Sequence, residues 1–519
     1  MNINRLPPEI LKLILFEAVK EESGKPSTVA NHRLLGVCFQ WKNLLVTNPG
    51  FWTNVHIWLV GDQSERIHSG GMSSTPNPDR YLKMLDLQLQ RAGSNLLDVF
   101  LCIDVEAELA RPFFGLMLHR APFRRWRTLE ILKVNWGSYA LPITREDDGF
   151  VNLESIEISY ECEPDLVRLI DRTATSKMTV FHANLSFEEV QEFFPNILSK
   201  ISELELGIES RGDFSPPPNV VTLTLPSFQL NSLSHILHLT LTYRQSITPF
   251  FIHDWTNLVS LDFIVGDLHS SLPPAQQIVS FPSLETLIIR GTLYIALAHF
   301  SAPRLRDLQF IDGWNSVLDS VDGLHEVLSH PSFLLSPSGV IEVHFPLNKK
   351  TLTDLIWAFP LMKTLKLHFE EDYDGWETVK SVFCNWRTTK RMAIQSETEA
   401  TSSHSTVLMQ QLVSLDLRLK WDYEEGMSED WKVRMLKVLE DTKGTSLNEI
   451  RCSWMIRTDY MPGPGGSYIL LVPSIFQTIV SPDLGPKWTP PIICQRQPDE
   501  KKGEILEDIQ GNEGNNMLI

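Results

Sequence analysis

A short apolar pattern recurs along most of the chain and constrains its fold more than any other feature. In each copy an apolar residue is followed by two more, three and five positions later, as in Leu258, Leu261 and Phe263. Residues two apart lie on one face of a strand, and the earlier residue closes the preceding turn. Copies begin at residues 129, 153, 201, 220, 236, 258, 284, 305, 362 and 412, with a weaker copy at 447. One such unit cannot bury its own apolar face, so the pattern predicts parallel strands stacked into a solenoid.

Amphipathic stretches between the strands, such as residues 186–200 and 351–362, predict helices. Several copies lie 16 to 26 residues apart, and residues 177–183 form a poorer copy within a 48-residue interval. A strand and a helix in each unit resemble the leucine-rich repeat, although the consensus asparagine or cysteine is mostly missing. The resemblance implies an α/β fold with an irregular leucine-rich-repeat-like solenoid and a parallel sheet over residues 81–494. A non-repetitive α/β fold with leucine-rich strands is the alternative.

The two ends of this solenoid can be placed from composition. Residues 81–93 predict a helix and residues 95–104 a first strand, which together would form the entry cap. The tail, residues 495–519, contains six acidic and three basic residues and is predicted to be disordered.

The first sixty residues have a different, helical pattern. Residues 6–19 (LPPEILKLILFEAV) predict a helix that begins at a proline pair and is apolar over a wide arc. A second helix is expected over residues 29–47, ending before the sequence Asn-Pro-Gly, and Phe51 and Trp52 follow as apolar anchors. A unit of about fifty residues is marginal alone, and no disulfide or metal set supports it. We therefore expect a partner protein to cover part of it.

These residues resemble the F-box. The matching positions, which cover about a tenth of the chain, are Leu6, Pro7, Glu9, Ile10, Leu11, Val37, Cys38, Trp41, Pro49 and Trp52. The resemblance implies a three-helix F-box over residues 1–58, a linker over 59–80, docking on a Skp-type adaptor, and recruitment through it to a cullin–RING ubiquitin ligase. The adaptor-binding residues it implies are Leu6, Pro7, Ile10, Leu11, Ile14, Leu34, Val37, Cys38, Trp41, Pro49 and Trp52. The alternative is a plain helical cap, which would hide its apolar side chains instead of exposing them.

A substrate surface is expected on the strand face that the leucines do not occupy. Residues between the inward leucines should point the other way and be free to bind a protein target. They are Asp262, Ile288, Arg290, Gln309, Lys366, His368, Asp416 and Arg418. Trp314 and Trp376 each follow an Asp-Gly pair on an expected loop and are candidate anchors, with packing onto neighbouring residues as the alternative. The mixed charges indicate no substrate class.

Composition excludes several partners. A formal net charge of −18 argues against nucleic acid and anionic membranes, because both require a dense Lys/Arg surface. The six cysteines contain no CxxC pair, which indicates reduced thiols. Charged residues and prolines interrupt the first apolar stretch, unlike a signal peptide. We expect a soluble intracellular protein, cytoplasmic or nuclear.

No catalytic motif is present, so the chain is predicted not to be an enzyme and to need no cofactor or metal. His325 and His330 are five residues apart, whereas the helical zinc motif needs four. A hidden enzyme would require a cleft with paired carboxylates or a Cys/His pair. The second functional hypothesis is an interaction scaffold that uses the same solenoid outside any ubiquitin ligase.

Overall fold

The computed structural model describes most of the chain between residues 6 and 480. The described residues are 6–19, 31, 34–60, 78–105, 107–135, 149–159, 162, 164–208, 215–226, 233–245, 255–265, 278–290, 294–311, 317–328, 335–345, 347–369, 378–379, 381–382, 412–422, 449–458, 470–471 and 475–480. Trp314, Trp376, Leu447, most of the expected linker, and the tail from residue 495 lie outside them.

One 17-stranded sheet dominates the described residues. Its parallel strands are β1 (Asn54–Val60), β2 (Leu97–Asp104), β3 (Trp126–Asn135), β4 (Ser155–Ile158), β5 (Val180–Ala183), β6 (Glu203–Leu206), β7 (Thr222–Leu225), β8 (His238–Gln245), β9 (Ser260–Val265), β11 (Thr286–Arg290), β13 (Asp307–Ile311), β14 (Val340–Val343), β15 (Thr364–Phe369), β16 (Ser414–Asp422) and β17 (Glu449–Thr458). Each pairs with the next in chain order. The antiparallel strands β18 (Leu470–Leu471) and β19 (Ile475–Val480) follow β17.

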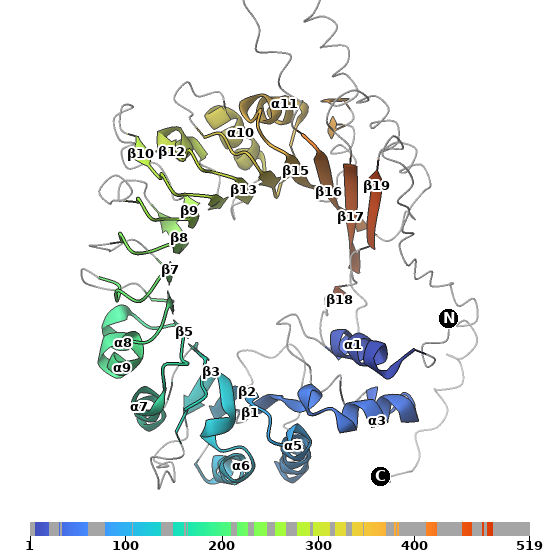
Figure 1. The fold of residues 1–519 in the computed structure, drawn as a ribbon, viewed down its shortest axis with the longest axis vertical. Coiled ribbons are helices and arrows are strands. Elements are labelled where there is room, and N and C mark those ends of the chain that lie inside the picture. Colours follow the sequence, from blue (N-terminus) through green and yellow to red (C-terminus); the bar gives the residue numbers. More distant parts are fainter. Residues whose placement is uncertain are drawn as a thin grey trace, which may run out of the picture.

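The sheet curves through most of a circle, with its strands inside and its helices outside (Figure 1). The outer helices are α5 (Pro78–Ala92), α6 (Ala107–Arg120), α7 (Pro164–Thr173), α8 (Phe187–Phe193), α9 (Pro195–Leu198), α10 (Val317–Leu328) and α11 (Lys349–Ala358). Shorter elements are the 3-10 helices η3 (Phe123–Arg125) and η6 (Tyr294–His299) and the separate parallel pair β10 (Val279–Ser280) and β12 (Phe300–Ser301). We call the two sheet faces inner and outer accordingly.

The repeating apolar pattern produces the core on the outer face. Leu261 of β9 lies in register between Leu239 and Leu287, and each of these side chains is buried. The first residue of the copies is buried as well, as at Leu258 and Leu284. The poorer copy over residues 177–183 follows the same phase and forms β5. The prediction of an α/β fold with a large parallel sheet is therefore confirmed.

Two strands depart from the predicted pattern. In β3 the buried residue is Ile131 and not Leu132, because the pairing with β2 shifts register between Leu101 and Cys102. Strand β14 was not predicted, because Ser338 occupies the position where the pattern has an apolar residue. The buried pair Ile341 and Val343 nevertheless continues the ladder.

The N-terminal helical unit consists of α1 (Pro8–Val19), α3 (Phe39–Thr47) and the 3-10 helix η2 (Pro49–Trp52). The expected single helix over residues 29–47 is wrong, because Cys38 is extended (φ −161°, ψ 166°) and α3 begins only after it. The boundaries differ too. Strand β1 begins inside the segment assigned to the F-box and is the first strand of the sheet, while α5 begins within the expected linker.

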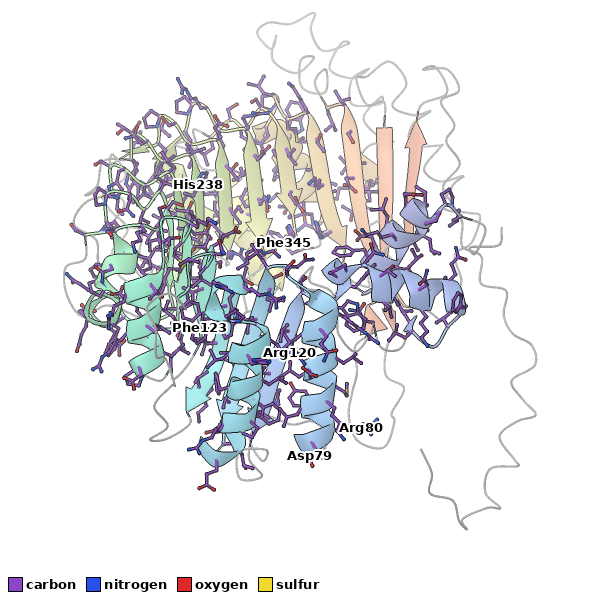
Figure 2. The ribbon with its side chains drawn as sticks, turned by 60° about the horizontal axis from the view of Figure 1, so that its bottom comes forward. Asp79, Arg80, Arg120, Phe123, His238 and Phe345 are labelled. Atoms are coloured by element: carbon purple, nitrogen blue, oxygen red, sulfur yellow. The ribbon has the colours of Figure 1, made fainter. Side chains whose placement is uncertain are left out.

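Close contacts hold the parts of this unit together and join it to α5. The rings of Phe16 and Phe51 lie 5.6 Å apart, and Trp52 Nε1 donates to the carbonyl oxygen of Leu45 at 2.8 Å. The guanidinium of Arg91, on α5, lies 4.4 Å from the centre of the Trp52 ring, a cation–π contact. Helices α1 and α3 accordingly stand beside α5, whose start is marked by Asp79 and Arg80 in Figure 2. No helix among the described residues has the length and apolar character needed to cross a membrane.

Candidate functional site

Two surfaces are candidates for function, and the first lies on the N-terminal helices. Helix α1 carries two adjoining apolar stripes. One stripe contains Leu11 and Leu15, which are fully buried in the core shared with the sheet. The other stripe remains exposed, with Leu13 63% exposed and Ile10 and Ile14 about 40%. The exposed apolar residues of both helices and the turn before α3 are Ile10, Leu13, Ile14, Val37, Phe39 and Val46. We call them the N-terminal apolar surface.

The implied adaptor-binding residues divide between core and surface. Leu11 and Trp52 are 0% exposed, so in this structure they belong to the core and present no surface to a partner. Ile10, Ile14 and Val37 are exposed apolar side chains, as expected. The remaining residues are half-buried (Leu6, Leu34, Cys38, Trp41) or exposed (Pro7, Pro49). Leu13, Phe39 and Val46 were missed, although the helical spacing of Leu13 from Ile10 could have indicated it.

The second surface is the inner face of the sheet. In-register pairing aligns one residue from each of six consecutive strands into a single row, because parallel strands repeat the same phase. This inner row is Asp262, Ile288, Gln309, Glu342, Lys366 and Asp416. Five of the six were predicted as substrate-facing, and Glu342 was missed together with its strand. Their side chains are partly exposed except for Glu342, which is 5% exposed.

A paired charge occupies one end of the inner row. Arg290 donates from Nε and Nη2 to the two carboxylate oxygens of Asp262, at 2.9 and 2.8 Å. The two hydrogen bonds and the opposite charge raise the pKa of Arg290. Asp262 and Arg290 are therefore brought together by the fold, and the Asp262 carboxylate, with 13% of its side chain exposed, is largely engaged internally.

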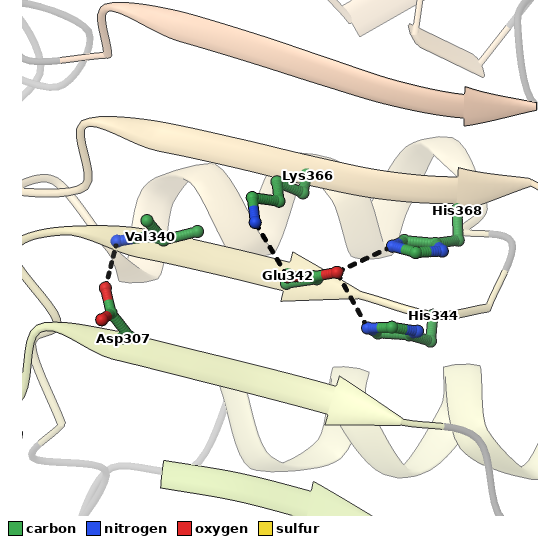
Figure 3. A network of polar contacts seen from close by, with 6 residues as sticks. All are labelled: Asp307, Val340, Glu342, His344, Lys366 and His368. Atoms are coloured by element: carbon green, nitrogen blue, oxygen red, sulfur yellow. Dashed lines mark hydrogen bonds and ion pairs between the residues drawn. The ribbon is translucent and has the colours of Figure 1, made fainter. Parts of the chain in front are cut away.

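A second polar group forms around Glu342, and Figure 3 shows it in front of the strands with the helices behind. His368 Nε2 lies 2.9 Å from Glu342 Oε1, and Lys366 Nζ donates to Oε2 at 3.2 Å. His344 Nε2 lies 3.0 Å from the same Oε1. Asp307 accepts from the backbone nitrogen of Val340 at 3.2 Å and ties the start of β14 to β13. We call Glu342, His344, Lys366 and His368 the Glu342 cluster.

The electrostatics of this cluster favour the carboxylate. His344, His368 and the Lys366 ammonium hold the pKa of Glu342 well below its usual range, although burial works in the opposite direction. The two imidazole rings stack at 3.9 Å with an angle of 21° between their planes. Lys366 and His368 were predicted for this face. His344 was not, because it follows the missed strand.

The remaining predicted inner-face residues are less closely associated. Asp416 pairs in register with Lys366 and Arg418 with His368, and the side chain of Arg418 lies outside the described set. On β5 and β6, nearer the N-terminal part of the sheet, His182 lies 3.1 Å from Glu203 and 3.6 Å from Glu205. Within the part of the chain that the structure describes, Cys38, Cys102 and Cys162 take part in no disulfide.

Comparison with known proteins adds no family assignment to this geometry. No protein-family model matches the chain, and no curated protein matches it. Functional inference therefore depends on the two surfaces themselves.

Proposed function

We propose that this chain is a non-catalytic substrate-recognition adaptor of an SCF-type (Skp–cullin–F-box) E3 ubiquitin ligase. The N-terminal helices would dock a Skp-type adaptor, and the inner face of the solenoid would bind a target protein. The observation that carries the proposal is the N-terminal apolar surface. A helical cap that served only to close the sheet would bury these side chains.

The distribution of burial in the helical unit supports this role. The unit is already anchored to the sheet through Leu11, Leu45 and Trp52, so the exposed residues are not needed to hold it. Exposed apolar side chains on neighbouring helices are a common feature of protein-binding surfaces. The F-box-like residues then supply the identity of the partner, a Skp-type adaptor, and through it a cullin.

The inner face supports a separate binding role. Its row combines both charge signs with the partly exposed Ile288, which is suited to a folded or extended protein target. A solenoid presents such a face over many strands and can bind a partner without a deep cleft. Binding of a protein target through this row needs no catalytic group.

The test measures the affinity of the full chain for a purified Skp-type adaptor by calorimetry. Leu13→Ser and Phe39→Ser should each weaken binding at least about tenfold, because buried apolar anchors dominate interface energy. Leu109→Ser is the matched control, since Leu109 lies on α6 and is 56% exposed against 63% for Leu13. It should bind like the wild type.

A wild-type chain that forms no complex with the adaptor would overturn the proposal. Equal affinity in the wild type and both N-terminal variants would do the same. Either result would favour the alternative function, a leucine-rich-repeat-like interaction scaffold that acts outside any ubiquitin ligase. Circular dichroism of each variant establishes that it is folded before its affinity is compared.

A further inference from the structure

The Glu342 cluster brings three side chains of metal-ligating type to one point on the inner face. Two imidazole nitrogens approach one carboxylate oxygen, His368 Nε2 at 2.9 Å and His344 Nε2 at 3.0 Å. The His344 nitrogen is buried and has no aligned hydrogen-bond partner within the described part of the chain. An imidazole nitrogen that carries no proton presents a lone pair, and a cation shared with Glu342 Oε1 would satisfy both groups.

We propose that Glu342, His344 and His368 bind a divalent transition-metal ion of the Zn²⁺ class. The three ligand atoms lie within 4.8 Å of one another, and this is the set with that geometry among the described residues. Two imidazoles and a carboxylate are the ligand types that such ions prefer. Two tetrahedral ligands at about 2.0–2.1 Å from a common ion lie about 3.3–3.4 Å apart, so the nitrogen–oxygen distances of 2.9 and 3.0 Å would widen by about 0.3–0.5 Å when the ion binds.

The backbone holds these ligands in place. Glu342 and His344 are two residues apart at the end of β14, so both face the inner side of the sheet. Strand β15 brings His368 beside them, and Figure 3 shows both imidazoles directed at the Glu342 carboxylate. The glutamate is 5% exposed and the two histidine side chains are 27% and 14% exposed. The site is therefore largely buried and lies on the inner face of the sheet.

Lys366 acts on the site from the second carboxylate oxygen. Its Nζ donates to Oε2 at 3.2 Å, which leaves Oε1 facing the two imidazoles. Such a hydrogen bond orients a ligating carboxylate, but the ammonium also repels a nearby cation. Three protein ligands leave at least one coordination position open toward the inner face. A side chain of a bound protein could occupy it.

The experiment measures Zn²⁺ binding to the full chain by competition with a chromogenic chelator, and Co²⁺ absorption spectra report the ligand set. His344→Ala and His368→Ala should each weaken Zn²⁺ binding at this site at least about tenfold. At Zn²⁺ concentrations that fill the wild-type site, each variant should therefore bind one equivalent less than the wild type. Lys366→Gln should tighten the site, because it removes a like charge. His182→Ala is the matched control, a histidine of another inner-face carboxylate cluster, and should leave binding unchanged.

Several results would overturn the proposal. The first is a wild type that binds no Zn²⁺. The second is a Zn²⁺ stoichiometry that neither histidine variant lowers. Glu342→Gln changes the third ligand independently of the two histidines, and thermal unfolding without metal establishes that each variant is folded. Zn²⁺ binding that His182→Ala abolishes would place the ion elsewhere. The outcome does not depend on adaptor docking, so this inference and the proposed function fail separately.

Discussion

Two leucines of α1 should respond to the same substitution to very different degrees. Leu11 is 0% exposed and packs in the shared core, whereas Leu13 is 63% exposed. Leu→Ala in a packed core costs about 2.7–5 kcal/mol, because the lost transfer energy adds to a cavity. Full burial of a leucine stabilises by about 1.5–3 kcal/mol, so the buried third of Leu13 accounts for about 0.5–1 kcal/mol. Both changes alter helix propensity equally.

Hydrogen exchange of the α1 amides in the full chain is the suitable assay. A sheet this long need not unfold in one step, so a global unfolding free energy would average over unrelated regions. Leu11→Ala should accelerate exchange by about 100-fold, the equivalent of 2.7 kcal/mol, while Leu13→Ala should change it by about fivefold or less. Of these two residues, only Leu13 is expected to contact the adaptor.

Similar exchange rates in the two variants would refute the reasoning. They would mean that α1 is not held by its Leu11 stripe, and that exposure in the free chain does not distinguish the two faces of the helix. The exposed side chains of the N-terminal apolar surface could then no longer be interpreted as a free binding surface.

Three further predictions concern the body of the molecule. Asp171→Ala should accelerate exchange of the α9 amides, with a loss of about 2–3 kcal/mol, because the Asp171 carboxylate accepts from the backbone nitrogens of Asn196 at 2.9 Å and Ile197 at 3.0 Å. Burial raises the pKa of the Cys102 thiol to about 11. At pH 9 about 1% of it is thiolate, so iodoacetamide should modify it at least about 50-fold more slowly in the native chain than in urea, as mass spectrometry would show. Leu261→Ala should cost about 3–5 kcal/mol in the exchange of β9 and its neighbouring strands, since the side chain is fully buried in the ladder.

The sequence predicted the strands where local pattern and tertiary packing agree. The copy at residues 258–263 became β9 with its three apolar residues buried, because parallel stacking repeats the environment that the pattern implies. It missed β14, where Ser338 replaces the leading apolar residue and the long-range pairing with β13 supplies the strand. In β3 a register shift moved burial from Leu132 to Ile131, and no local signal indicates such a shift.

The functional surfaces were predictable in part for the same reason. Alternation along a strand predicts that Lys366 and His368 face away from the core, and they do. It does not predict which residues of neighbouring strands meet, because the spacing between copies varies. Glu342 is 24 residues from Lys366 in sequence, yet it pairs with it in register. On the N-terminal helices, periodicity identified apolar residues but could not divide Leu11 from Ile10, because that division depends on where the sheet lies.

The inner row shows why this fold can change its binding properties without changing its core. The leucine ladder occupies the outer side of each strand, so the inner residue of the same strand contributes little to the packing that holds the repeats together. A substitution at Ile288 or Lys366 therefore changes the surface that a partner meets while Leu287 and Leu365 keep the ladder intact. Glu342 is the exception, because its buried carboxylate has to be compensated by His344, His368 and Lys366. A buried carboxylate that costs stability unless three other side chains accompany it is therefore the residue of the inner row least free to change alone.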